Sequence, residues 1–238
     1  MNFINFNGKF IEAQTAVISA DNRGLRYGDG LFETIKYKNN ALILIDEHLS
    51  RLWKGMQLLQ FDIPKLFTPD NLQDQILLLL KKNNLTTARV RLSIVRGNGG
   101  LYDAVNHHPL YIIQAWSIAD NNTTLNENGL QVCIYNEAKK ALDNFSNLKH
   151  NNYLPYFMGA LFAKKQQCND ALILNQHDRI CDSTIANIFI VKGESIFTPP
   201  LAEGCVAGVM RKFILQQLIE QGLTVTETAL TKEDLLNA

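Results

Sequence analysis

Apolar and polar residues follow two different spacings along this chain. A spacing of two is typical of half-buried strands, and a spacing of three to four is typical of amphipathic helices. Strands are predicted over residues 3–6, 9–11, 31–37, 42–45, 88–96, 108–116, 130–136, 170–175, 187–192 and 194–198. Helices are predicted over residues 46–59, 71–81, 152–168 and 209–221. Because both kinds of element recur throughout, the pattern predicts a mixed fold of helices and sheets.

Turn residues divide the N-terminal strands into two hairpins. Asn7-Gly8 joins the first pair of strands, and Asn-Gly is a strong hairpin signal. Asn39-Asn40 joins the second pair. Asp46 follows, and because aspartate often caps helix N-termini, we expect it to be the N-cap of the first long helix.

One polar stretch separates two parts of the chain. Residues 117–129, SIADNNTTLNENG, are rich in Asn and Thr and predict an interdomain linker. An N-terminal domain of helices and strands is therefore expected over residues 1–116, and a C-terminal domain over residues 130–238. A length of 238 residues accommodates two modest domains.

The composition narrows the class of protein. Apolar residues make up 46% and charged residues 19%, which is enough apolar material to fill a core. The 23 basic and 23 acidic residues give a net charge of +0, whereas nucleic-acid binders usually carry a basic surplus. Apolar runs such as residues 76–80 are too short to span a membrane, and the N-terminus lacks the pattern of a secretory signal.

The cysteines and histidines predict neither a disulfide framework nor a metal site. Cys133, Cys168, Cys181 and Cys205 are scattered and form no C-x-x-C pair. This distribution fits reduced thiols, so we expect a cytoplasmic protein. The five histidines lack metal-ligand spacing, so no metal is expected.

Glycines precede the last long helix, in GCVAGVMRKFIL at residues 204–215. Gly208 stands where the unpaired backbone N–H groups of a helix start suit a phosphate, and it would let a ligand approach the backbone closely. An ordinary glycine-rich helix start explains the same pattern. A Walker phosphate loop is absent, because no Lys-Ser/Thr pair follows the glycines.

Several charged residues are candidates for a functional site, but each can also be explained as an ordinary surface or structural residue. Lys149, in LKHNNY, is by default a solvated surface charge, and so is Arg51 on the first long helix. Asp182 stands in an apolar setting, where a carboxylate is paired, caps a turn or has a raised pKa. Arg91 and Arg96 have opposite parity on one strand and should face opposite sides. One of them could bind a substrate carboxylate through a bidentate contact.

Five motifs in chain order together resemble the class IV family of pyridoxal-phosphate (PLP) enzymes, fold type IV. They are RYGDGLFETI at residues 26–35, HLSRL at 48–52, LKHNNYLP at 148–155, ICDSTIANIF at 180–189 and TPPLAEGCVAGVMR at 198–211. The family includes branched-chain and D-amino acid aminotransferases and aminodeoxychorismate lyase. The resemblance implies a two-lobed fold of the α+β or α/β class. A small N-terminal α+β domain would precede a larger C-terminal domain with a mixed-sheet pseudo-barrel, and the protein would be a homodimer.

The resemblance also implies PLP as cofactor and a role for each motif. Lys149 would form the Schiff base with PLP and, once freed by an amino-acid substrate, act as general base on its α-proton. Asp182 would keep the ring nitrogen protonated, and the Tyr153 hydroxyl would bond the ring oxygen O3′. Arg51 and the amides of Val209 and Met210 would hold the phosphate. Further cofactor-binding positions are Thr184, Val206 and Gly208, and the substrate-binding positions are Tyr27, Phe32, Arg91 and Arg96.

The chain departs from the family pattern at three points. Asp182 stands in place of a glutamate and is one methylene shorter, so it must lie closer to the ring or act through a water. Met210 replaces a threonine, which removes a hydroxyl donor and keeps the backbone amide. The family pattern continues beyond TKEDLLNA with a strand and a loop that helps to bind the substrate carboxylate. The enzyme is then naturally short, or a tail is missing.

The segment RGNGGLY at residues 96–102 bears on the choice of reaction. It resembles the lyase pattern Arg-Gly-x-Gly-Gly-Arg-Gly-Tyr, but Leu101 replaces the second arginine. D-amino acid aminotransferases have a pair that resembles Arg96-Gly97, whereas branched-chain enzymes place an arginine nearer the position of Arg91. We expect an aminotransferase that passes an amino group from an amino acid to a 2-oxo acid. The alternatives are a 4-amino-4-deoxychorismate lyase and a degenerate PLP-binding protein without turnover.

Overall fold

The structure is a computed structural model of the chain, and it describes residues 2–102, 106–119 and 126–238. The chain forms two compact units. Unit 1 comprises Met1–Leu125 together with Lys149–Asn152, and unit 2 comprises Asn126–Leu148 and Tyr153–Ala238. Unit 2 begins inside the stretch predicted as the linker. Residues 120–125 of that stretch lie outside the described residues, so the linker and the exact domain bounds stay predictions.

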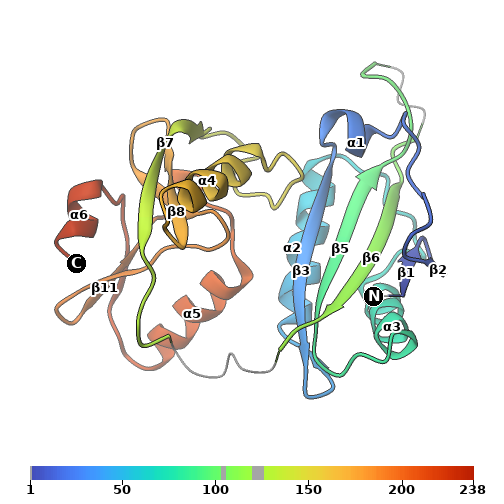
Figure 1. The fold of residues 1–238 in the computed structure, drawn as a ribbon, viewed down its shortest axis with the longest axis horizontal. Helices are drawn as coiled ribbons and strands as arrows, with labels where there is room; N and C mark the ends of the chain where they lie inside the picture. The colour runs from blue at the N-terminus through green and yellow to red at the C-terminus, as the bar shows by residue number, and fades with distance from the viewer. Residues whose placement is uncertain (1, 103–105, 120–125) are drawn as a thin grey trace. The chain divides into compact units, whose positions relative to one another are not determined.

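Unit 1 is built on a six-stranded antiparallel sheet with helices packed against it (Figure 1). The strands, in sheet order, are β2 (Lys9–Glu12), β1 (Phe3–Phe6), β6 (Pro109–Ser117), β5 (Ala88–Arg96), β3 (Gly30–Lys38) and β4 (Ala41–Leu42). A short helix α1 (Arg23–Tyr27) precedes β3. Helix α2 (Ile45–Leu58) packs on β3, and helix α3 (Pro69–Lys82) packs on β1 and β6.

The core of unit 1 follows the predicted alternation. Val90, Leu92 and Ile94 are fully buried, whereas Arg89, the residue before Val90, is exposed. Helices α2 and α3 contribute further buried side chains, which recur at helical spacing: Leu49, Leu52, Met56, Leu72, Ile76, Leu79 and Leu80. The strand β5 pairs with β3 and β6 in unbroken register, so each of its residues has a defined face.

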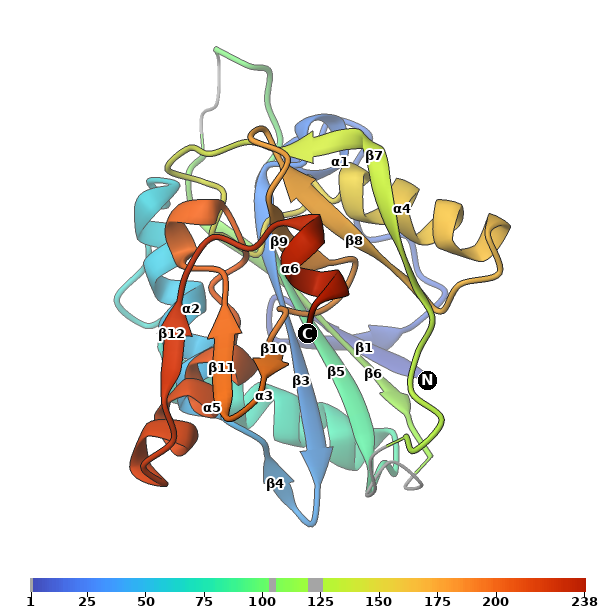
Figure 2. The same ribbon diagram turned by 90° about the vertical axis from the view of Figure 1, so that its left-hand side faces the viewer.

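Unit 2 contains two three-stranded sheets, each with parallel and antiparallel pairs. One sheet has the order β7 (Val132–Lys140), β8 (Asp170–Asn175) and β9 (Ile180–Ser183). The other consists of β10 (Ile190–Lys192), β11 (Ser195–Thr198) and β12 (Val225–Glu227), seen together in Figure 2. The helices are α4 (Leu154–Lys165), which links β7 to the parallel strand β8, then η1 (Leu201–Glu203), α5 (Val209–Glu220) and α6 (Lys232–Leu236). The predicted mixed α and β architecture is confirmed.

Two local predictions were wrong. Asp46 is not the N-cap of α2, because the helix starts one residue earlier at Ile45 and Leu44 occupies the cap position without a side-chain cap bond. Leu44 adopts a left-handed conformation with φ 54°, which turns the chain directly from β4 into α2. For the same reason the predicted strand over residues 42–45 is shorter, and β4 ends at Leu42.

Candidate active site

The segment Lys149–Asn152 pairs with the first residues of β3 inside unit 1. The Phe32 N–H donates to the Lys149 carbonyl at 2.9 Å, and the Asn151 N–H donates to the Gly30 carbonyl at 3.0 Å. Strand β4 pairs with β3 only at Tyr37 and Lys38, so the opposite end of this edge of β3 can accept the lysine segment. These backbone bonds fix the position of the candidate lysine.

Glycine allows this close approach. A Cβ on Gly30 would collide with the Ile94 carbonyl and with the side-chain amide of Asn151. Any other residue at position 30 would therefore separate β3 from the lysine segment. Gly30 therefore has a packing role in this motif.

Lys149 lies beside two of the candidate substrate-binding residues, Phe32 and Arg91. The Lys149 ammonium is 4.7 Å from the centroid of the Phe32 ring, and the Arg91 guanidinium carbon is 3.8 Å from the same centroid. Phe32 pairs with Ser93, and Arg91 is two residues from Ser93, so Phe32 and Arg91 share one face of the sheet. Unit 1 therefore brings two cations to one aromatic ring.

Arg96 is held in a buried hydrogen-bond network. Its Nε donates to Asp29 at 2.9 Å, its Nη1 to the Gln60 carbonyl at 3.2 Å, and its Nη2 to the Leu59 carbonyl at 2.5 Å. Its Nη1 also lies 2.7 Å from the His107 ring. Arg96 is 6% exposed, so most of its donors hold unit 1 together. A substrate carboxylate would have to replace these partners.

Tyr27, the last residue of α1, lies beside two other arginines of that helix. The guanidinium carbons of Arg23 and Arg26 are 5.7 and 5.1 Å from its ring centroid. Arg23 also bonds to Asp29 at 2.9 Å, which links α1 to the Arg96 network. The role of Tyr27 in substrate binding stays a prediction.

Arg51 on α2 forms a buried ion pair with Glu33 of β3. Its Nε and Nη2 donate to the two carboxylate oxygens of Glu33 at 2.8 and 2.5 Å, in the bidentate geometry that Arg favours. The Nδ1 of His48, one helical turn earlier, lies 2.7 Å from the same carboxylate. Glu33 is 1% exposed. The pair fixes the direction of the Arg51 guanidinium, and its phosphate-binding role stays a prediction.

The charge state of Glu33 follows from these partners. Burial alone would raise the pKa of Glu33, but hydrogen bonds and charges from His48 and Arg51 outweigh burial and hold that pKa below its ordinary value. The glutamate is therefore a stable anion at neutral pH. Its charge is balanced within unit 1 by the directly bonded Arg51 guanidinium.

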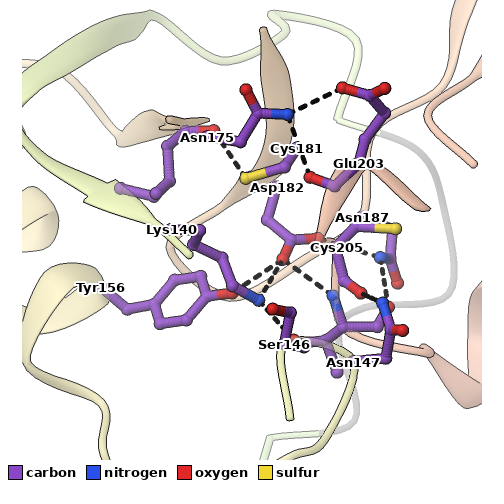
Figure 3. A network of polar contacts seen from close by, with 12 residues as sticks. Lys140, Ser146, Asn147, Tyr156, Asn175, Cys181, Asp182, Asn187, Glu203 and Cys205 are labelled. Atoms are coloured by element: carbon purple, nitrogen blue, oxygen red, sulfur yellow. Dashed lines mark hydrogen bonds and ion pairs between the residues drawn. The ribbon is translucent and has the colours of Figure 1, made fainter. Parts of the chain in front are cut away.

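Asp182 of β9 is the centre of a polar network in unit 2 (Figure 3). Its Oδ2 accepts a hydrogen bond from the Tyr156 hydroxyl at 2.7 Å and one from the Val206 N–H at 3.0 Å. Its Oδ1 accepts from the Asn187 side-chain amide at 3.0 Å. The Lys140 ammonium lies 3.7 Å from Oδ2. Asp182 is 2% exposed, so this carboxylate is buried but well supplied with donors.

Asn187 ties Asp182 to the candidate phosphate loop. Its amide nitrogen also donates to the Val206 carbonyl at 2.9 Å, so both the N–H and the carbonyl of Val206 are bonded within one cluster. The Asn187 oxygen occupies the space that a Cβ on Gly208 would need. Gly208 is the N-cap of α5, and among the described residues no side chain caps this helix start.

Asn147 joins the same loop to the chain just before the candidate lysine. Its carbonyl accepts from the Ala207 N–H at 3.0 Å, and its side-chain amide donates to the carbonyls of Leu201 at 2.8 Å and Cys205 at 2.6 Å. These contacts lie inside unit 2. They fix the chain two residues before Lys149 against the loop that precedes α5.

Tyr153 and Thr184 are brought together in unit 2. The Tyr153 hydroxyl donates to the Thr184 carbonyl at 2.9 Å, and the Thr184 hydroxyl donates to Asp170 at 2.5 Å. The Tyr153 ring stacks on that of Tyr156, with centroids 4.6 Å apart. The hydroxyl of Tyr156 in turn donates to Asp182, so Tyr153, Thr184 and Asp182 belong to one connected cluster.

Met210 lies in the first turn of α5, and its side chain is 54% exposed.

Sequence reasoning missed the residues that orient the candidates. Glu33, Lys140, Asn147, Tyr156 and Asn187 all bond to a candidate or to the loop that carries one. Four of them lie within the quoted motifs or within two residues of one, but Lys140 does not. Proximity to a motif was the only available signal, because a single sequence does not show which side chains converge.

Comparisons with known proteins define the class. Residues 30–238 match the family model described as amino-transferase class IV. The chain belongs to the class IV aminotransferase family, whose members are PLP-dependent enzymes, and it is an enzyme of that family.

Individual relatives include enzymes of two reaction types. A putative branched-chain-amino-acid aminotransferase of Methanocaldococcus jannaschii is 31% identical over 99% of this chain and 81% of the relative. An aminodeoxychorismate lyase of Vibrio harveyi is 29% identical over 94% of this chain and 82% of the relative. The solved branched-chain amino acid aminotransferase of Escherichia coli has a TM-score of 0.87 and 26% identity, covering 98% of this chain and 78% of that one. The fold and the family are therefore established together.

Two further observations concern other kinds of site. Within residues 2–102, 106–119 and 126–238, no group of His, Cys, Asp or Glu is arranged to hold a metal ion. In the same described residues, no helix combines the length and apolar character needed to cross a bilayer.

Proposed function

We propose that this protein is a PLP-dependent aminotransferase that moves an amino group from an amino acid to a 2-oxo acid, with Lys149 as the covalent attachment point of the cofactor. The observation that carries the proposal is the buried Asp182 carboxylate, bonded to the same loop that leads into α5. A carboxylate and a helix start held in one cluster match a cofactor with a basic ring nitrogen and a phosphate.

The described residues fit PLP in their donor chemistry. Asp182 would hold the protonated ring nitrogen, and the N–H groups of Val209 and Met210 at the start of α5 would hold the phosphate. Gly208 has no Cβ in the space that Asn187 fills, so the loop stays compact at that point. Arg51 would contribute a cation to the phosphate, with its orientation set by Glu33. Bound PLP supplies an electron sink for the bonds at the substrate α-carbon.

The remaining roles belong to side chains of this chain. The Lys149 amine would hold the cofactor at rest and, once released, take the α-proton and return it at another carbon. Tyr153 would support the ring oxygen O3′, and Thr184 and Val206, which bond to Tyr153 and to Asp182 respectively, would also contact the cofactor. Phe32 and Tyr27 would contact the substrate.

Arg91 is a better candidate than Arg96 for the substrate carboxylate. The carboxylate of an amino acid is bonded directly to the α-carbon, so its receptor must lie near the base that acts on that carbon. Arg91 and Lys149 contact the same Phe32 ring, whereas Arg96 is surrounded by Asp29, Gln60 and Leu59. An arginine at position 91 supports the aminotransferase interpretation of branched-chain type.

Aminodeoxychorismate lyase remains the second candidate, supported by the 29% identity to the Vibrio harveyi enzyme. The two reactions differ in their products. If the PLP form is incubated with amino acids, an aminotransferase leaves pyridoxamine phosphate on the protein. If it is incubated with aminodeoxychorismate, a lyase releases pyruvate and 4-aminobenzoate. A homodimer stays an expectation that sedimentation or scattering would test.

The absorbance spectrum tests the attachment site. Wild-type protein should show a visible cofactor band that borohydride removes, and Lys149→Ala should lack it. Lys164→Ala, which removes an exposed lysine of α4, should keep it. A reducible band in Lys149→Ala would refute the assignment. A wild-type band that no amino acid and no aminodeoxychorismate changes would instead support a PLP-binding protein without turnover.

A further inference from the structure

Lys140 is a buried lysine at the end of β7, outside every motif that pointed to the cofactor. It is 7% exposed, and its Nζ donates to the Ser146 carbonyl at 2.7 Å. The same ammonium lies 3.7 Å from the Oδ2 of Asp182 and 5.3 Å from the centroid of the Tyr156 ring (Figure 3). Because an unpaired buried ammonium is costly, Lys140 and Asp182 act as an ion pair.

The Asp182 carboxylate is held by two kinds of interaction. Tyr156, Val206 and Asn187 donate hydrogen bonds at 2.7 to 3.0 Å, and these uncharged donors set its orientation. The Lys140 ammonium, at 3.7 Å, is too distant for a hydrogen bond but close enough for a strong Coulomb interaction in a buried setting. Lys140 therefore contributes mainly charge, while its hydrogen bond goes to Ser146.

The charges of Asp182 and Lys140 act in opposite directions on the pKa values of the neighbouring thiols. Burial, followed by the charge of Asp182, raises the pKa of Cys181 to about 12, and Lys140 acts in the opposite direction. Burial and Asp182 likewise raise the pKa of Cys205 to about 11, opposed by Arg211 and Lys140. Burial and Asp182 also raise the pKa of Tyr156, so its hydroxyl stays a donor. The titratable groups that face the pair include Tyr156 of α4, Cys181 of β9 and Cys205 of the loop, and Arg211 of α5 acts on Cys205.

We propose that Lys140 is a positioning residue that sets two proton affinities. One is that of the Asp182 carboxylate itself, and the other is that of the cofactor ring nitrogen that Asp182 would hold. A fixed positive charge beside a carboxylate favours the ionised form and weakens its hold on any second positive group. Lys140 keeps Asp182 ionised in the free protein and moderates the proton affinity of the ring nitrogen in the complex. The second part rests on the proposed function, and the first part does not.

The free protein tests the first part. We would label aspartate carboxyl carbons with 13C and assign the Asp182 signal by its loss in Asp182→Asn. In Lys140→Met the pH at which Asp182 takes up a proton should rise by about one unit or more. Lys140→Arg should restore the wild-type midpoint, because it keeps the charge. Lys139→Met, which removes a lysine paired with the exposed Asp178, should leave the midpoint unchanged.

An unchanged Asp182 midpoint in Lys140→Met would overturn the proposal. If that variant does not fold by circular dichroism, Lys140→Gln replaces it, because its amide can still donate to Ser146 without a charge. An unchanged midpoint in Lys140→Gln would be equally decisive.

The complex with PLP labelled with 15N at the ring nitrogen tests the second part. In Lys140→Met the ring nitrogen should keep its proton to a higher pH than in wild type, and in Asp182→Asn it should lose it at a lower pH. The same ring titration in Lys140→Met and wild type would overturn the second part. If Asp182→Asn leaves the ring nitrogen unchanged, the assignment of Asp182 in the proposed function fails, while the carboxyl titration of the free protein still decides the role of Lys140.

Discussion

Glu33 of unit 1 and Asp182 of unit 2 are both buried carboxylates, and they differ in how their charge is balanced. Glu33 of unit 1 is 1% exposed and makes a bidentate pair with Arg51 at 2.5 and 2.8 Å, with His48 at 2.7 Å. Asp182 of unit 2 is 2% exposed and accepts hydrogen bonds from Tyr156, Val206 and Asn187, and the Lys140 ammonium lies 3.7 Å from it.

The difference separates a structural carboxylate from one suited to a ligand. A directly bonded guanidinium satisfies both the charge and the lone pairs of Glu33. Uncharged donors orient Asp182 but leave more of its negative potential to act on a nearby cation. Burial and charge are therefore not sufficient to mark a catalytic carboxylate, because the kind of partner decides what the carboxylate can still do.

The largest expected effect is on turnover. Asp182→Asn should lower kcat by about 10²- to 10³-fold, because it removes a charge that would stabilise the transition state, while the amide keeps the shape. Glu33→Gln should change kcat far less. Single-turnover kinetics of both variants with wild-type levels of bound PLP would measure this. If Glu33→Gln lowered kcat as much as Asp182→Asn, the distinction between the two carboxylates would be wrong.

The next-largest expected effect is on stability, and here Glu33 matters more than Asp182. Glu33→Gln leaves the largely buried Arg51 guanidinium without its counter-charge, which should cost about 3 kcal/mol of unfolding free energy. Denaturant unfolding of the protein without cofactor would measure it. Asp46→Asn in the exposed first turn of α2 is the control, and it should cost less than about 1 kcal/mol. Equal losses in the two variants would contradict the structural role of Glu33.

The stabilisation by Glu33 should also depend on pH in a defined direction. The pKa of Glu33 is lowered in the folded protein, so its contribution is fully present above the pKa of an unfolded glutamate and is lost as the pH falls through the lowered value. Wild type should therefore lose its advantage over Glu33→Gln only in acid, below about pH 4. A constant difference between the two proteins from pH 7 down to acid would contradict this assignment.

The elements of both units were largely predictable, and the contrast between the carboxylates was not. Hydrophobic spacing shows which face of β5 or α2 is buried, because burial repeats with the period of the element. The spacing does not show that Arg51 turns to Glu33, or that Lys140 and Tyr156 meet at Asp182. Those contacts join residues 18, 42 and 26 positions apart, counting from 33 to 51, from 140 to 182 and from 156 to 182.

Motif resemblance supplied Lys149, Tyr153 and Asp182, but it also treated Arg91 and Arg96 as equal candidates. Strand parity placed them on opposite faces, and the unbroken β5 register agrees. Only tertiary packing shows that Arg96 is enclosed by Asp29 and two backbone carbonyls, because those partners come from loops whose path the spacing does not encode.

The next expected effect, in order of size, is that of replacing Arg91. If it binds the substrate carboxylate, Arg91→Met should raise KM by about 10- to 100-fold, the loss of one charge-assisted hydrogen-bonded contact. Arg89→Met, on the same strand but exposed and resting on Trp116, should leave KM unchanged. Steady-state kinetics over a range of substrate concentrations separates KM from kcat. An unchanged KM in Arg91→Met would move the carboxylate receptor elsewhere.

The smallest effect concerns Asn187, whose side chain bonds both Asp182 and the loop before α5. Asn187→Ala removes two hydrogen bonds and should weaken PLP binding by about 1 to 2 kcal/mol. Gly208→Ala should also weaken binding, because its Cβ would meet the Asn187 oxygen.

The double variant tests whether these two effects share one contact. In Asn187→Ala/Gly208→Ala the Cβ of residue 208 no longer meets the amide, so the combined loss should be smaller than the sum of the single losses. Equilibrium titration of the four proteins with PLP measures the coupling, and Asn128→Ala, an exposed residue far along the chain, serves as the neutral control. Strict additivity would mean that Asn187 supports Asp182 without also shaping the helix start, and that the carboxylate of unit 2 is oriented independently of the phosphate end of the cofactor.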